Sequence, residues 1–159
     1  LEKNKWVPEV VWAGREDLDE RSVKMQNDMK NYLKNHPEIS SKFKFLGEVK
    51  NINELYQKVD ALIHPSIYEG LPNVICEAMI LGCCVLASNV CDHPIILAEE
   101  RGLLFDPKDP VSIFNAIDKF NSMNIMERNE MAKKARKFSE ENFTLKKHVE
   151  SFEKVLKNN

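Results

Sequence analysis

Short apolar segments alternate with amphipathic ones along the chain, and this alternation constrains the fold more than any other feature. The apolar segments have the length and residue content of buried strands. Strands that alternate with helices predict parallel β–α units. The expected fold is therefore α/β: a Rossmann-like, mostly parallel sheet with helices on both faces. The expected strands lie in "PEVVWAG", "KFKFLG", "DALIHPS", "CCVLAS" and "GLLF".

The expected helices are segments in which apolar residues recur every three or four positions. Asp109 followed by Pro110 is a strong signal for a helix start. We expect helices over residues 19–35, 52–59 and 73–81, a short helix or turn over 93–100, a helix from Pro110, and two more after it. In the last helix, Leu145, Val149, Phe152 and Leu156 share one stripe.

Length and composition limit the class of protein. The chain has 159 residues, which suits one domain, and a net charge of −2 gives no sign of a nucleic-acid surface. No apolar run is long enough to span a membrane, although a longer protein containing this chain could still associate with a membrane surface. We expect a cytoplasmic protein with no nucleic-acid partner, no metal and no cofactor. The four cysteines lack metal-ligand spacing and are expected to be small buried side chains: Cys76, Cys83, Cys84 and Cys91.

Two glutamates flank the start of one predicted helix. Glu69 lies in the loop after "DALIHPS", and Glu77 lies about five residues into an otherwise apolar helix. Ligands of parallel α/β sheets bind outside the carboxyl ends of the strands, where this loop should lie. Gly70 allows close approach of a ligand. Pro72 suits the first position of the helix, whose free N–H groups favour phosphate.

The pair of carboxylates predicts a ligand with hydroxyls at both ends. An ionised carboxylate only accepts hydrogen bonds, and two neighbouring hydroxyls can donate to its two oxygens. A nucleotide-sugar offers such groups at the sugar and at the ribose, with a diphosphate between them. Each residue also has a simpler interpretation: Glu77 could form a buried ion pair with Arg101, and Glu69 could be a solvated loop residue.

The stretch "PSIYEGLPNVICEAMILGCCVLAS" resembles the signature of the retaining GT-B glycosyltransferases of group 1, family 4, in which two glutamates are separated by seven residues. The flanking stretches "FKFLGEVKNINELYQKVDALIHPS" and "RGLLFDPKDPVSIFNAI" are also similar to that family. The resemblance implies that residues 1–159 are the C-terminal, donor-binding half of a two-domain enzyme. This half would lack its first β–α unit and the N-terminal acceptor domain.

The resemblance also implies a role for each site residue. Glu69 would hold the hydroxyls of the donor sugar at the reacting centre, as the expected catalytic residue, and Glu77 would hold the ribose diol. The other expected donor-binding residues are Gly70, Leu71, Pro72 and Asn73, whose backbone would line the sugar and phosphates, and Val49, in the turn beside the base.

Two segments depart from the family pattern. The family grips the diphosphate with Gly-Arg and a Lys about five positions later, whereas here Gly14-Arg15 is followed by Glu20. We interpret Arg15 as a surface residue and "VVWAG" as the family's second strand, with the clamp upstream. After "CCVLAS", the segment "NVCDHPII" replaces the family's paired glycines and glutamate. Asp92 or His93 could still reach a ligand there, although His93 is expected to be structural or exposed, and His64 to pack beside the site.

The implied function is transfer of a hexose from a nucleotide-sugar to an acceptor hydroxyl with retention, in glycan, polysaccharide or glycolipid synthesis. In such a reaction the departing diphosphate helps to deprotonate the acceptor, and the protein positions the donor. The chain by itself is expected to bind donor weakly and transfer little or nothing. Other interpretations are a non-catalytic nucleotide-sugar binding module, an inactive fragment, or another GT-B enzyme such as an epimerase or phosphorylase.

Overall fold

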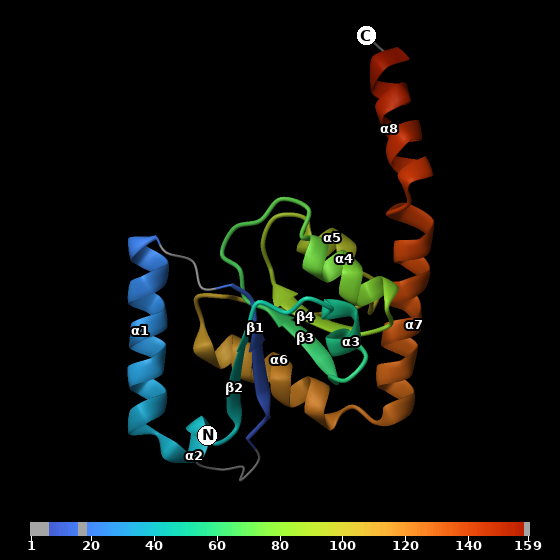
Figure 1. The fold of residues 1–159 in the computed structure, drawn as a ribbon. Helices are drawn as coiled ribbons and strands as arrows, with labels where there is room; N and C mark the ends of the chain where they lie inside the picture. Colours follow the sequence, from blue (N-terminus) through green and yellow to red (C-terminus); the bar gives the residue numbers. More distant parts are fainter. Residues whose placement is uncertain (1–6, 16–18, 158–159) are drawn as a thin grey trace. The chain divides into compact units, whose positions relative to one another are not determined.

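The computed structural model describes residues 7–15 and 19–157, and the chain divides into two compact units, residues 1–52 and 53–159 (Figure 1). Both units contain a parallel sheet connected by helices. The predicted α/β class with parallel strands is therefore confirmed. Each unit is described by itself.

The first unit is a single parallel β–α–β arrangement. Strands β1 (Val10–Ala13) and β2 (Phe43–Gly47) pair in parallel. Helix α1 (Glu20–Asn35) connects them, and the Asp19 carboxylate caps it by accepting hydrogen bonds from two backbone N–H groups of its first turn. A short helix that the sequence analysis missed, α2 (Pro37–Ser40), follows α1.

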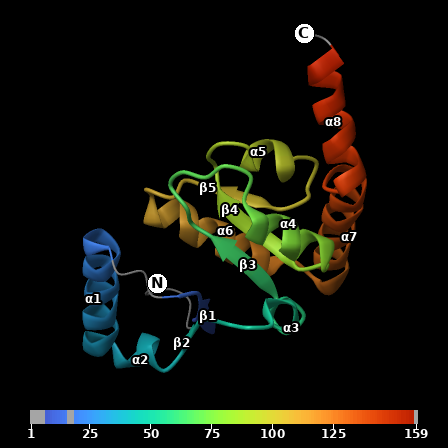
Figure 2. The ribbon, with the colours of Figure 1, turned by 45° about the horizontal axis from the view of Figure 1, so that its top comes forward.

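The second unit contains a three-stranded parallel sheet in the order β3-β4-β5. The strands are β3 (Ala61–His64), β4 (Cys84–Ser88) and β5 (Leu103–Phe105). In Figures 1 and 2, α4 and α6 lie on opposite sides of this sheet. The helices are α3 (Ile52–Tyr56), α4 (Asn73–Ile80), α5 (His93–Ile96), α6 (Pro110–Ser122), α7 (Ile125–Asn142) and α8 (Leu145–Lys157).

The central strand β4 is buried on both faces. Its residues Cys84 and Leu86 pack in one core cluster with Phe120 of α6 and Met131 of α7. Successive side chains of a strand point to opposite faces, so Val85 and its neighbours two positions away lie on the other side. On α4, which contacts β3 and β4, the side chains of Ile75, Ala78 and Met79 have no exposed surface. This double burial explains why β4 is apolar at almost every position.

The helix starts follow the sequence signals closely, with one correction. The Asp109 carboxylate accepts a hydrogen bond from the Val111 N–H, and Pro110 occupies the first turn of α6, as predicted. Pro72, in contrast, is the N-cap of α4 and not its first residue, because its ψ of 105° is extended. In α7, Asn124 and Glu127 form a capping box that the sequence analysis did not identify.

The last helix and the cysteines give two further results. In α8, Val149 and Leu156 of the predicted stripe are exposed; the side chains of Leu145 and Phe152 lie outside the described part. Cys83 and Cys84 are buried, and Cys76 is half-buried. Cys91 is exposed, so the prediction that all four cysteines are buried is wrong for this residue. In the part of the chain that the structure describes, no helix has the length and apolar character needed to cross a membrane.

We expect Gly102→Ala to destabilise the second unit. An added Cβ would lie 2.7 Å from the Val85 carbonyl oxygen and 2.9 Å from Cδ2 of Leu97, and the backbone oxygen cannot move cheaply. Such overpacking costs about 1–3 kcal/mol, which urea denaturation can measure. Gly70→Ala is the matched control, because its added Cβ would have no atom within 4 Å. Equal unfolding midpoints for the two variants would contradict this packing.

We expect the four thiols to divide into fast and slow groups. Burial raises the pKa of the Cys83 thiol to about 11 and also raises the pKa of Cys84, whereas Cys91 is exposed. A thiol reagent at neutral pH should therefore modify Cys91 first, and all four cysteines should titrate after denaturation without reductant. Cys91→Gly, which tolerates the φ of 49° at this position, should remove the fast phase. A fast phase that persists in this variant would contradict the assignment.

Candidate functional site

Glu69 lies in the loop between β3 and α4, which leaves the sheet at the carboxyl end of β3. The Ser66 hydroxyl donates to the Tyr68 carbonyl oxygen across 3.0 Å and shapes this loop. Oε1 of Glu69 lies 3.3 Å from Nε2 of His64, the last residue of β3. About a third of the Glu69 side chain is exposed, at 33%. The loop therefore presents a carboxylate that solvent reaches and a histidine contacts.

Glu77 is the fifth residue of α4, and its side chain is exposed. Its carboxylate acts on Tyr56 of α3, whose own side chain is buried. The Tyr56 hydroxyl donates to the Val74 carbonyl oxygen at 3.3 Å. Burial, together with the adjacent Glu77 carboxylate, raises the pKa of Tyr56 to about 12. The phenol thus stays protonated beside the carboxylate.

Arg101 does not pair with Glu77, so the ion-pair interpretation is wrong. The Arg101 guanidinium is buried and pairs with Glu99 at 2.8 Å. Its Nε–H donates to the carbonyl oxygen of Ile96 and its Nη2 to that of Ile95, and its Cζ lies 3.9 Å from the centre of the Phe138 ring. These contacts hold the end of α5 against α7. Because Glu77 is also exposed, it needs no buried counter-ion.

The start of α4 lies between the two glutamates in the chain. Its N-cap residue, Pro72, is buried and offers no side-chain hydrogen bond, so no side chain caps the first turn. Gly70, Leu71 and Asn73 are all exposed. The first N–H groups of an uncapped helix favour an anion. The predicted residues therefore have unequal exposure: Gly70, Leu71, Asn73 and Glu77 are exposed, Glu69 is half-buried and Pro72 is buried.

The remaining predicted residues have different surroundings. Val49 is half-buried and Arg15 is exposed; both belong to the first unit, and the role of Val49 stays a prediction. Asp92 is exposed at the start of α5. His93 is completely buried, which confirms a structural position for it and excludes an exposed one. His64 lies beside Glu69, as predicted.

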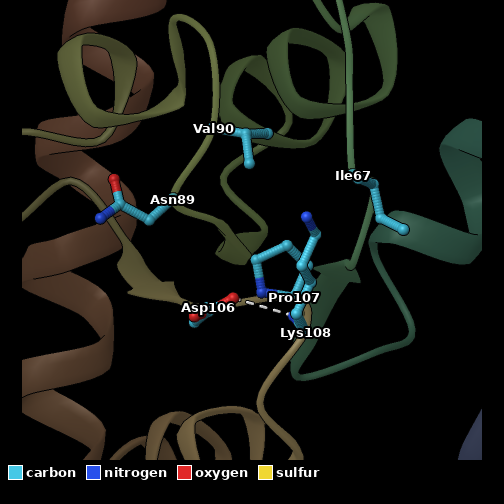
Figure 3. Close-up of a pocket in the computed structure, with 6 residues that line it drawn as sticks. All are labelled: Ile67, Asn89, Val90, Asp106, Pro107 and Lys108. Carbon is cyan, nitrogen blue, oxygen red and sulfur yellow. Dashed lines mark hydrogen bonds between the residues drawn. The ribbon is translucent and has the colours of Figure 1, made fainter.

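A pocket of about 370 Å³ opens at the carboxyl ends of the three strands of the second unit. It combines apolar walls with an amide, a carboxylate and an ammonium group, which are groups that hydrogen-bond to polar ligands. In Figure 3 the Lys108 ammonium points toward the space between Ile67 and Val90, and Oδ1 of Asp106 accepts the Lys108 backbone N–H at 2.9 Å. The lining residues are Ile67 after β3, Asn89 and Val90 after β4, and Asp106, Pro107 and Lys108 after β5.

The sequence analysis missed Tyr56. In the sequence, Tyr56 looks like an ordinary apolar residue of α3. No motif indicates that its hydroxyl donates a hydrogen bond to a residue of α4. Only the three-dimensional contact between α3 and α4 reveals it. Within the described ranges, no group of three or more His, Cys, Asp or Glu side chains has an arrangement that could hold a metal ion.

The fold matches GT-B glycosyltransferase folds. The structure of Anabaena Alr3699/HepE in complex with UDP superimposes with a TM-score of 0.81 and 21% identity, over 96% of this chain and 41% of that chain. This likeness concerns the fold alone.

Residues 8–138 match the family of glycosyl transferases group 1, and the chain belongs to this family. It is 35% identical over 98 residues to an uncharacterised glycosyltransferase of Methanocaldococcus jannaschii, covering 58% of this chain and 25% of the relative. It is 27% identical over 109 residues to the Escherichia coli UDP-Gal:alpha-D-GlcNAc-diphosphoundecaprenol alpha-1,3-galactosyltransferase, covering 66% of this chain and 28% of that protein. The chain thus spans about a quarter of the length of these relatives.

We expect Tyr56 to ionise only well above the pH at which an exposed tyrosine does. Because its folded pKa of about 12 exceeds the ordinary value of 10, the unfolded state loses its proton first and stability falls as pH rises through this range. Tyr56→Phe should remove that loss and, at neutral pH, cost about 1 kcal/mol through the lost hydrogen bond to Val74.

Urea denaturation between neutral pH and pH 12 measures both effects of the Tyr56 substitution. Tyr68→Phe is the control, because that side chain is 84% exposed. The same alkaline loss of stability in wild type and Tyr56→Phe would show that Tyr56 is not held as described.

Proposed function

We propose that this chain is the donor-binding half of a retaining glycosyltransferase that moves a hexose from a nucleotide-sugar to an acceptor hydroxyl. One observation carries the proposal: two solvent-accessible carboxylates, Glu69 and Glu77, lie before and after the uncapped start of α4. Membership of the glycosyltransferase family supports the reaction class. We further propose that the acceptor site belongs to another domain of a longer protein, and that the chain by itself transfers little or no sugar.

The proposed ligand follows from the charges of this segment. Glu69 and Glu77 offer only hydrogen-bond acceptors and would repel a phosphate, whereas the first turn of α4 offers N–H donors. A ligand must therefore carry hydroxyls at both ends and its negative charge in the middle. In a nucleotide-sugar the ribose diol would meet Glu77, the diphosphate would meet the backbone from Gly70 to Asn73, and the sugar would meet Glu69.

A uridine nucleotide is the donor to test first. The Escherichia coli relative is named for a UDP-Gal donor, and the HepE structure was obtained with UDP. We propose the same nucleotide class for this chain. The donor sugar is proposed to be a hexose, and the product a glycan, polysaccharide or glycolipid.

The proposed reaction forms a bond between the acceptor oxygen and the anomeric carbon while the bond from that carbon to the phosphate oxygen breaks. The acceptor proton passes to the departing diphosphate on the same face of the sugar. Glu69 would hold the sugar in position, and the α4 amides would stabilise the charge that grows on the leaving phosphate. We propose that this step needs no metal or other cofactor.

Substitution of the two glutamates should weaken the binding of different ligands. Glu77→Gln should weaken both UDP and UDP-hexose by about ten-fold or more, because charge-assisted hydrogen bonds contribute roughly 1.5–3 kcal/mol. Glu69→Gln should leave UDP almost unchanged and weaken only UDP-hexose, because its proposed partner is the sugar. Calorimetric titration of UDP, UDP-glucose and UDP-galactose against wild type and both variants measures these effects.

Glu141→Gln, an exposed substitution on α7, is the control and should change neither ligand. Equal losses of UDP in both glutamate variants, or no loss in either, would refute the division of roles. Normal donor binding without transfer, in a protein that also contains the acceptor domain, would favour a binding module over an enzyme.

A further inference from the structure

A pair of histidine rings lies behind Glu69. His64 ends β3 and His93 begins α5, and their ring centres are 5.7 Å apart. His93 has no exposed surface, and the His64 side chain is only 18% exposed. Nε2 of each ring is buried and has no partner with full hydrogen-bond geometry in the described part of the chain. Buried polar atoms without partners are costly, so this pair needs an explanation.

The proton of His93 is fixed by the main chain. Nδ1 of His93 lies 2.7 Å from the Ser88 carbonyl oxygen. Because a carbonyl oxygen only accepts, Nδ1 carries a proton in this contact. His93 is therefore anchored to the end of β4 and forms a rigid surface against the His64 ring.

Nε2 of His64 lies close to the Glu69 carboxylate. Nε2 of His64 lies 3.3 Å from Oε1 of Glu69. A carboxylate also only accepts, so the two atoms can form a hydrogen bond only when Nε2 carries the proton. The contact lacks full hydrogen-bond geometry, and catalytic hydrogen bonds are often long or poorly aligned before substrate binds. Burial, reinforced by His93, lowers the pKa of His64 against the opposing effect of Glu69, which favours the neutral ring with a single N–H.

We propose that His64 is a positioning residue for the donor sugar: its Nε2–H holds Oε1 of Glu69, while His93 holds the His64 ring. Oε2 of Glu69 then stays free to accept a hydrogen bond from a sugar hydroxyl. A neutral donor orients the carboxylate without cancelling the negative charge that binds the hydroxyl. This inference rests on the proposed function, because it needs Glu69 to bind the sugar.

A positioning role and a packing role predict different binding data. His64→Phe keeps a ring against His93 but removes the donor, and should weaken UDP-glucose by about five- to ten-fold while leaving UDP unchanged. His64→Gln can return an N–H donor near the same place and should restore most of the affinity. In the Glu69→Gln background, His64→Phe should add little further loss, because the two residues act through one contact. His36→Gln, in the first unit, is the control and should have no effect.

Nitrogen-15 NMR of the histidine rings tests the contact without any ligand. We expect the Nε2–H tautomer at His64, the Nδ1–H tautomer at His93, and a shift of the His64 signals in Glu69→Gln. An Nδ1–H tautomer at His64 would overturn the inference, as would equal weakening of UDP and UDP-glucose by His64→Phe, or no weakening. If wild type binds neither ligand, the proposed function fails, and the NMR result alone decides whether His64 holds Glu69. If His64→Phe does not fold, the spectra of wild type and Glu69→Gln decide it.

Discussion

The burial of β4 on both faces is the constraint on which the second unit depends. Side chains of α6 and α7 cover one face, and α4 contacts β3 and β4 on the other. Since β4 pairs with both β3 and β5, this packing fixes the edge at which all three strands end. The loop of Glu69, the anchor of His93 at Ser88 and the pocket after β5 all lie along that edge. The position of the candidate site is therefore set by the packed core around β4 more than by the loop that carries Glu69.

The charges around α4 are the second constraint. A helix start without a side-chain cap attracts anions, yet carboxylates lie both before it and within the helix. A free phosphate is attracted by the helix amides and repelled by both carboxylates. A ligand with hydroxyls on each side of its phosphates can instead hydrogen-bond to the amides and to both carboxylates. We propose that this arrangement selects a nucleotide-sugar over simpler anions. The raised pKa of Tyr56 and the lowered pKa of His64 agree with this arrangement, since each shift favours a neutral side chain beside a carboxylate.

The sequence could predict the features that depend on neighbouring residues. The strands, the Asp109 cap and the loop position of Glu69 follow from local patterns of apolar, proline and capping residues. It could not predict features decided by contacts between distant segments. Arg101 turns toward the α5 carbonyls and Phe138, which leaves Glu77 exposed. The ring of His93 is buried and hydrogen-bonds to the Ser88 carbonyl oxygen, whereas Cys91 is exposed. These contacts and exposures depend on the direction in which each side chain points, and a pattern of residue types does not specify that direction.

The most direct test of the account is a crystal structure of the chain with a UDP-hexose bound. We predict ribose hydroxyls within hydrogen-bond distance of Glu77, a phosphate at the first turn of α4, and a hexose hydroxyl on Oε2 of Glu69. His64 should donate to the other oxygen of that carboxylate. A ligand bound in the reverse order, or one that leaves both glutamates in contact with solvent alone, would contradict the central claim that these two carboxylates hold the two ends of the donor.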